Sequence, residues 1–393
     1  MMRANPYTPG AGFMPAYLAG REENIKNAER YMISLKQRYP QQSVVYHGLR
    51  GVGKTVLLNR LEEIAEDEDI LYEHIEIKEK DGFIPQIINS SIKFIRQMSR
   101  KEKAKEAIEK AFMAIKNLKI TISPEEGSFS VGFAELEQEL QCVSTLMDEL
   151  TDVFVSLGNI ALKTNDTICF FIDEIQYLKK DELEALVNGI HRVNQKRLPI
   201  MIFGAGLPKV LKELGEAKSY SERLFKFEEI GALSKEDARL AIIEPAKKLE
   251  VEYEQKAVEE IVMITKGYPY FIQEFCKIIW EAEEDNYIAL EAVKDKKSAF
   301  YTTLDQGFFK VRYDRSSKRE KDFMFAMVKC QELPCTISNV AKVMKKTTTS
   351  ISPIRAQLIS KGLIYATGHA EIDFTVPRFD EFLKRVNPEL SLD

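Results

Sequence analysis

The apolar positions between residues 20 and 230 follow two alternating periods, one typical of strands and one of helices. Short runs rich in β-branched and aromatic residues predict strands at 43–47, 70–77, 167–172, 199–203 and 224–228. Apolar residues spaced three and four apart predict helices at 22–38, 55–67, 83–98, 100–116, 136–162, 181–197 and 209–214. Strands that alternate with helices are typical of a parallel sheet, so we predict an α/β fold with helices flanking the sheet.

Three local departures from this alternation are expected. Runs at 119–123 and 128–133 predict a small hairpin inserted between helices. The long helical pattern at 136–162 is expected to break near Gly158, because glycine weakens a helix interior. The first 20 residues are rich in Pro and Gly and predict an irregular arm.

Beyond residue 230 the pattern becomes helical and then mixed. Helices are predicted at 235–249, 255–266 and 270–284, with no strand between them. The last part of the chain predicts helices at 317–329, 340–344, 353–361 and 379–386, and short strands at 363–366 and 371–375. Three helices followed by two short strands around a turn form the order of a winged helix, which residues 291–315 would tether to the preceding helices.

The length of 393 residues fits two or three domains at roughly 100–200 residues each. We expect an N-terminal arm at 1–20, an α/β core at 21–230 with the hairpin insertion near 119–133, a helical domain at 231–304 and a winged-helix domain at 305–393.

Composition limits the class of protein further. The chain is 45% hydrophobic and 30% charged, which is ordinary for a globular protein with sizeable cores. No apolar run approaches the ~20 residues of a membrane-spanning helix, and the N-terminus lacks the basic and apolar segments of a secretory signal. The five cysteines are odd in number and unpatterned, which argues against a disulfide framework or structural zinc. We therefore expect a cytoplasmic protein with no membrane partner.

A complete phosphate-binding motif follows the first predicted strand. The pattern G-x-x-x-x-G-K-[ST] is met by Gly48, Leu49, Arg50, Gly51, Val52, Gly53, Lys54 and Thr55. Glycines allow a tight loop whose backbone N–H groups cradle phosphate oxygens at the start of the next helix, where Val56 follows. Lys54 would reach the β- and γ-phosphates, and the Thr55 hydroxyl would bind Mg²⁺. The alternative is a Gly-rich turn with an incidental lysine.

Two carboxylates follow the apolar strand at 167–172. In phosphate-loop hydrolases the first carboxylate, here Asp173, holds the shell of the Mg²⁺ ion, and the second, here Glu174, polarises the attacking water. A lone Asp would suit a kinase or a pure switch, whereas Asp-Glu favours hydrolysis of ATP. The alternative is that the pair only caps the next helix.

These residues resemble the AAA+ and STAND branch of the phosphate-loop ATPases, particularly archaeal-type ATPases and, more distantly, origin-recognition ATPases. Gly20 and Arg21 look like the part of the family's segment that lies against the adenine, although a plain helix start is the alternative. Tyr268 and Pro269 resemble the turn of the helical lid that leans on the nucleotide, although an ordinary turn between helices is the alternative. The resemblance makes residues 231–304 the lid.

The chain also departs from the family pattern. Residues 203–206 read Phe-Gly-Ala-Gly, where the family places a polar sensor, and Tyr270 stands where many members carry a sensor arginine. These departures favour a STAND-like switch with slow hydrolysis. Arg223 lies where an arginine finger from a neighbouring subunit would be, which implies a homo-oligomer, and a surface ion pair is the alternative.

The winged helix predicts contact with double-stranded DNA. The net charge of the chain is −5, yet residues 305–393 hold 15 basic and 11 acidic residues. In this motif the third helix enters the major groove, and lysines beside it contact phosphates. The expected DNA-contacting residues are Lys342, Lys345, Lys346, Thr348, Ser350 and Arg355.

The sequence thus favours an ATPase whose nucleotide state, with Mg²⁺, controls a DNA-binding domain. The alternative is a signalling or defence switch whose winged helix binds a protein partner or inhibits its own chain. A small-molecule kinase is disfavoured, because the layout offers no site for a phosphate acceptor.

Overall fold

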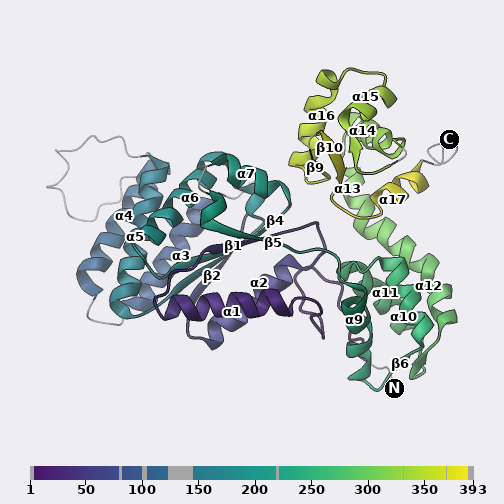
Figure 1. Ribbon diagram of the computed structural model, residues 1–393, viewed down its shortest axis with the longest axis horizontal. Helices are drawn as coiled ribbons and strands as arrows, with labels where there is room; N and C mark the ends of the chain where they lie inside the picture. The colour runs from purple at the N-terminus through teal and green to yellow at the C-terminus, as the bar shows by residue number, and fades with distance from the viewer. Residues whose placement is uncertain are drawn as a thin grey trace. The chain divides into compact units, whose positions relative to one another are not determined.

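The computed structural model describes residues 4–78, 82–99, 104–122, 145–217, 221–330, 332–368 and 370–387 (Figure 1). Its contacts divide the chain into two compact units. One unit comprises Arg21–His47 and Lys54–Glu229, and the other comprises Met1–Gly20, Gly48–Gly53 and Ile230–Asp393.

The unit Arg21–His47 plus Lys54–Glu229 is built on a five-stranded parallel sheet with the order β2-β3-β4-β1-β5. The strands are β1 (Ser43–His47), β2 (Leu71–Glu76), β3 (Ile168–Asp173), β4 (Ile200–Gly206) and β5 (Phe225–Glu229). Every residue of β3 and β4 is buried, as expected for strands covered on both faces. This sheet confirms the predicted α/β class.

Helices flank this sheet (Figure 1). They are α1 (Glu22–Lys36), α2 (Lys54–Asp67), α3 (Phe83–Met98), α4 (Lys105–Ile122), α5 (Leu146–Thr164), α6 (Lys180–Gln195), α7 (Lys209–Ala217) and α8 (Ser221–Leu224), with a short 3₁₀ turn, η3 (Ile175–Tyr177). The predicted bounds of β1 and α3 are met to the residue.

Aromatic packing fixes the position of β3, the strand that ends in the two carboxylates. The ring of Phe170 meets Phe94 and Phe154 edge-on, with centroids 5.3 and 5.5 Å apart. The next residue of β3, Phe171, stacks on Phe203 of β4 with ring centroids 5.4 Å apart. Such pairs add stabilisation beyond the area that they bury, so the end of β3 rests on a packed core.

Two predictions for this unit are wrong. Residues 119–122 form the last turn of α4, because the buried Ile115 and Leu118 extend its helical face; the second predicted strand, 128–133, lies outside the described residues. The helix α5 does not break at Gly158. A Cβ at that position would lie 2.7 Å from the Cβ of Leu198, so the glycine permits close packing between elements.

The other unit contains a helical domain made of α9 (Lys235–Lys247), α10 (Gln255–Thr265), α11 (Pro269–Ala282) and α12 (Leu290–Thr303). The prediction of no strand between these helices is wrong, because β6 (Glu252–Tyr253) lies between α9 and α10 and pairs with β7 (Tyr287–Ile288). A two-residue strand is too short to show a period in the sequence.

The N-terminal arm is irregular, as predicted, and it docks on this helical domain. The hydroxyl of Tyr7 donates to the carbonyl of Ile242 at 2.5 Å, and the Trp280 indole N–H donates to the carbonyl of Ala4 at 3.0 Å. Tyr7 is buried and its ring meets that of Trp280 edge-on. The arm is therefore an integral part of the domain.

The last part of the unit begins without interruption after α12. A π-helical segment, η4 (Leu304–Phe309), continues into α13 (Lys310–Asp314). Then follow α14 (Lys318–Val328), β8 (Cys335–Thr336), α15 (Ile337–Val343), α16 (Thr348–Ser360), β9 (Ile364–Gly368), β10 (Glu371–Phe374) and α17 (Phe379–Val386). The three strands form an antiparallel sheet with the order β8-β10-β9.

The segment 291–315, expected to tether the C-terminal domain, is helical almost throughout, and its Phe309 stacks on Phe382 of α17 with centroids 5.4 Å apart. One predicted boundary differs. The helix expected at 353–361 begins five residues earlier, at Thr348, because the side chain of Thr347 accepts a hydrogen bond from the Ser350 N–H and caps it.

Candidate functional site

The phosphate loop has the backbone that its glycines predict. Gly51 and Gly53 adopt φ angles of +82° and +90°, in the left-handed region that favours glycine. Between them Val52 is buried, with 1% of its side chain exposed, which anchors the loop. The helix α2 begins directly after the loop at Lys54. A tight glycine loop leading into a helix N-terminus is the backbone arrangement that binds phosphate.

A hydroxyl and a carboxylate meet beside the start of α2. The Thr55 hydroxyl lies in the first turn of α2 and donates to Oδ2 of Asp173 at 2.6 Å. Asp173 is the last residue of β3 and is only 4% exposed. Its other oxygen accepts a hydrogen bond from the Glu174 N–H at 2.7 Å. Hard oxygen donors of this kind suit Mg²⁺, so the residues present fit the ion that a bound nucleoside triphosphate brings.

Glu174 has an unusual backbone and a fixed side chain. Its φ of +54° is in the left-handed region, which non-glycine residues adopt rarely. Its carboxylate accepts a hydrogen bond from the side-chain N–H of Gln176. The side-chain oxygen Oε1 of Gln176 accepts a hydrogen bond from the Leu207 N–H at 2.9 Å. Glu174 is the N-cap residue of the short turn η3, but its side chain makes no capping hydrogen bond there, and the N-cap of the following helix α6 is Lys179.

Gln176 is a site residue that the sequence reasoning missed. It is 2% exposed and connects the carboxylate of Glu174 to the backbone directly after β4. No spacing in the sequence distinguishes this glutamine. Its only signal is its place two residues after a carboxylate pair.

The predicted lid turn contacts the phosphate loop within its own unit. The Tyr268 hydroxyl donates to the carbonyl of Arg50, and the Tyr270 N–H donates to the carbonyl of Gly51 at 3.2 Å. Tyr268 is 3% exposed, and burial raises the pKa of its hydroxyl, so it stays a hydrogen-bond donor at neutral pH. Pro269 is the first residue of α11, a position that suits its fixed φ.

Three further predicted residues lie elsewhere in the chain. Gly20 has a φ of +65°, and a Cβ there would lie 2.9 Å from the Asp237 carboxyl carbon. Arg21 is buried at the N-cap of α1. Arg223 is exposed in α8, where its carbonyl accepts a hydrogen bond from the Gln42 side chain at 2.7 Å.

Most of the residues expected to contact DNA are exposed around one helix start. Lys342 lies in the last turn of α15, Lys345 and Lys346 lie in the turn that follows, and Thr348 and Ser350 occupy the first turn of α16; all five are exposed. Arg355 is partly buried instead, and its Nε is a buried donor without a hydrogen-bond partner among the described residues.

Two family models match parts of the chain. Residues 37–211 match an AAA domain, and residues 306–383 match a domain of unknown function (DUF8462). No curated protein matches the sequence.

Solved structures resemble the chain over most of its length. The Walker-type ATPase PABY2304 of Pyrococcus abyssi superposes with a TM-score of 0.55 and 15% identity, over 93% of this chain and 96% of that chain. The Aeropyrum pernix Orc1 protein in complex with DNA has a TM-score of 0.45 and 15% identity, over 96% of this chain and 95% of that chain. Cdc6p from Pyrobaculum aerophilum has a TM-score of 0.48 and 14% identity, over 98% of this chain and 97% of that chain. At these identities the likeness concerns the fold alone.

The parallel sheet, the glycine loop and the AAA-domain match together define a phosphate-loop ATP hydrolase. Residues 37–211, which contain the glycine loop and the two carboxylates after β3, are the segment that is similar to an AAA domain. In the part of the chain that the structure describes, no helix combines the length and apolar character needed to cross a membrane.

Proposed function

We propose that this ATPase is a slow switch whose nucleotide state controls DNA binding by residues 305–393. The observation that carries the first half is the hydrogen bond between Thr55 and Asp173, which joins the helix after the phosphate loop to the end of β3. The second half is supported by the helical path α12–η4–α13, which joins the lid to the C-terminal domain without an irregular linker.

Each predicted site residue has a role in this proposal. Lys54 binds the β- and γ-phosphates, and Thr55 and Asp173 hold the Mg²⁺ ion that comes with ATP. Glu174 orients the attacking water and accepts its proton, with Gln176 fixing the carboxylate. Arg223 acts in a homo-oligomer, where its exposed side chain reaches the nucleotide of a neighbouring subunit.

We interpret residues 305–393 as a winged helix. In support, the order of its elements is three helices, α14, α15 and α16, followed by the antiparallel pair β9 and β10, with β8 completing the sheet. In this interpretation α16 enters the major groove with Thr348 and Ser350 at the base edges. The exposed lysines before it contact phosphates.

The proposal is tested by ATP turnover of the full chain with and without duplex DNA, together with the particle size in ATP and in ADP. We expect slow, Mg²⁺-dependent turnover that changes when DNA is added, and no turnover in Lys54→Ala. Turnover that does not change with DNA, together with a particle size that is the same in ATP and in ADP, would favour the alternative. That alternative is a signalling switch whose C-terminal domain binds a protein.

A lysine variant locates the DNA-binding surface. Replacing Lys342, Lys345 and Lys346 by alanine removes three phosphate contacts, so the slope of log affinity against log salt should fall by about 3. The matched control replaces three exposed lysines of the α/β unit and the lid: Lys180, Lys212 and Lys247. Equal effects of the two triple variants would show that the proposed surface is not the one that binds.

A further inference from the structure

Two arginines lie at the end of α13, the helix that joins the lid to the C-terminal domain: Arg312 within the helix and Arg315 as its C-cap. Among the described residues, no ion pair involves Arg312 or Arg315. Two other arginines of the same part of the chain form ion pairs: Arg378 lies 3.5 Å from the Glu381 carboxylate, and Arg385 donates to both carboxylate oxygens of Asp305 at 2.5 and 2.7 Å. Two neighbouring arginines without a carboxylate partner are suited to an anionic ligand.

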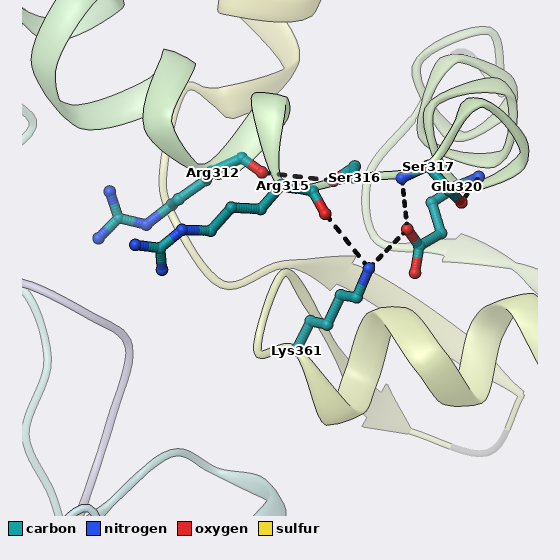
Figure 2. A network of polar contacts seen from close by, with 6 residues as sticks. All are labelled: Arg312, Arg315, Ser316, Ser317, Glu320 and Lys361. Atoms are coloured by element: carbon teal, nitrogen blue, oxygen red, sulfur yellow. Dashed lines mark hydrogen bonds and ion pairs between the residues drawn. The ribbon is translucent and has the colours of Figure 1, made fainter. Parts of the chain in front are cut away.

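The two guanidinium groups extend side by side in one direction (Figure 2). They point away from Ser317 and Glu320, which lie on the other side of the helix end in the same view. Arg312 is partly buried, its guanidinium lies 4.1 Å from the ring centre of Phe308, and it donates to the Phe308 carbonyl. The side chain of Arg312 is therefore held in place before any ligand arrives.

A chain of contacts within one unit leads from the phosphate loop to Arg312. The Tyr270 N–H donates to the carbonyl of Gly51 at 3.2 Å, and the Tyr270 ring stacks on Phe308 with centroids 4.6 Å apart. Phe308 in turn lies under the Arg312 guanidinium. Tyr270 occupies the position of the missing lid arginine, so its ring stack brings a different arginine toward the same loop.

Two other positive charges act on Arg312. Burial, and then the positive charge of Arg50 in the phosphate loop, lowers the pKa of Arg312 to about 10, and Arg315 acts in the same direction. The carbonyl of Arg50 accepts the hydrogen bond that the buried Tyr268 hydroxyl donates. Like charges that converge on a phosphate loop repel each other until an anion with several negative charges lies between them.

We propose that Arg312, assisted by Arg315, binds the phosphates of the nucleotide held by the loop Gly48–Gly53. Arg312, which lies in the helix after the lid, thereby supplies the positive charge that an arginine at the position of Tyr270 would supply. This inference rests on the proposed binding of ATP at the loop, but it does not require that the protein bind DNA.

The same helix is tied to the candidate DNA-binding helix, which gives the contact a consequence. Lys361, the C-cap of α16, donates to the Arg315 carbonyl at 3.3 Å and to the Glu320 carboxylate at 2.8 Å (Figure 2). Glu320 also accepts a hydrogen bond from the Ser317 N–H at 2.7 Å. Phosphate bound by Arg312 and Arg315 therefore orients α13 and, through Lys361, the base of α16.

The test compares the affinities of wild type and Arg312→Ala for Mg²⁺-ATP and for tripolyphosphate, which carries the phosphates without the base. Removing a charge-assisted contact should weaken both ligands by roughly tenfold or more and by a similar factor. Arg312→Lys should recover part of the loss. The matched control is Arg319→Ala, an exposed arginine of α14, which should bind both ligands as wild type does.

Unchanged ATP affinity in Arg312→Ala would overturn the inference. So would weakened ATP with unchanged tripolyphosphate, because the contact would then not be to phosphate, and so would an equal loss in Arg319→Ala. Arg312→Ala could weaken the affinity for both ligands while the DNA affinity of the wild type is the same with ATP and with ADP. That result would support the phosphate contact and contradict the proposed control of DNA binding by the nucleotide.

Discussion

At the scale of single residues, the account depends on how tightly the two carboxylates after β3 are placed. Asp173 is fixed by the hydroxyl of Thr55, and Glu174 by the amide of Gln176 and by a left-handed backbone. A carboxylate held in advance loses little freedom when it orients a water molecule, which is how a single side chain contributes strongly to hydrolysis.

Glu174→Gln should keep ATP affinity and reduce turnover on the order of 100-fold or more, because the amide cannot accept the proton of the attacking water. Turnover and binding of a fluorescent ATP analogue, measured on the same sample, check this. The control is Glu216→Gln, an exposed glutamate of α7 that should leave both values unchanged. Equal turnover in wild type and Glu174→Gln would remove Glu174 from the mechanism.

At the scale of elements, the sequence predicted most of what periodicity and motif spacing can reveal. The strands of the main sheet have long apolar runs, and the phosphate loop has a full motif, so both could be located in advance. The strand predicted at 119–123 was wrong over residues 119–122, because the β-branched run after Leu118 favours a strand locally, whereas packing of α4 against α5 decides for helix. Arg312 and Gln176 carry no local pattern, because their neighbours come from distant parts of the chain.

The glycine in α5 offers a test of element packing. Gly158→Ala should lower the free energy of unfolding by about 1–3 kcal/mol, because its new methyl group would overlap Leu198. Gly215→Ala in α7 is the matched control, since nothing lies within 4 Å of its added Cβ; it should be neutral or stabilise by up to about 1 kcal/mol. Urea unfolding measures both, and a stabilised Gly158→Ala would contradict the packing described for α5.

The contact between α14 and α16 offers a second test, with a dependence on pH. Burial alone would raise the pKa of Glu320, but the hydrogen bonds from Lys361 and Ser317 lower it below its usual value. A lowered native pKa stabilises the fold above the pKa of the unfolded chain, and that stabilisation is lost as the pH falls through the native value.

Lys361→Met should therefore destabilise the fold by about 1–2 kcal/mol at pH 7, less than for a fully buried pair because Lys361 is 39% exposed. The difference from wild type should shrink below about pH 4, where the carboxylate becomes protonated. Thermal unfolding of wild type and Lys361→Met at pH 7 and below about pH 4 measures this difference. A difference that grows in acid would contradict the ion pair.

At the scale of the whole molecule, the phosphate loop and the C-terminal domain share one unit of the chain. The loop Gly48–Gly53, the lid and residues beyond 304 belong to the same compact unit, although the loop comes far earlier in the sequence. A helix without interruption from α12 through α13 is stiff, so a change at the lid is passed on as a movement of the domain that follows. The fold thus provides a physical route from nucleotide state to the exposed start of α16.

The affinity of the full chain for duplex DNA, titrated at low salt with Mg²⁺-ATP and again with ADP, tests this route most directly, with Glu174→Gln holding the ATP state. The account predicts that DNA binds several-fold tighter in one nucleotide state than in the other and that the affinity falls steeply as salt is added. Equal affinity in both states, or no binding at low salt in either, would contradict it.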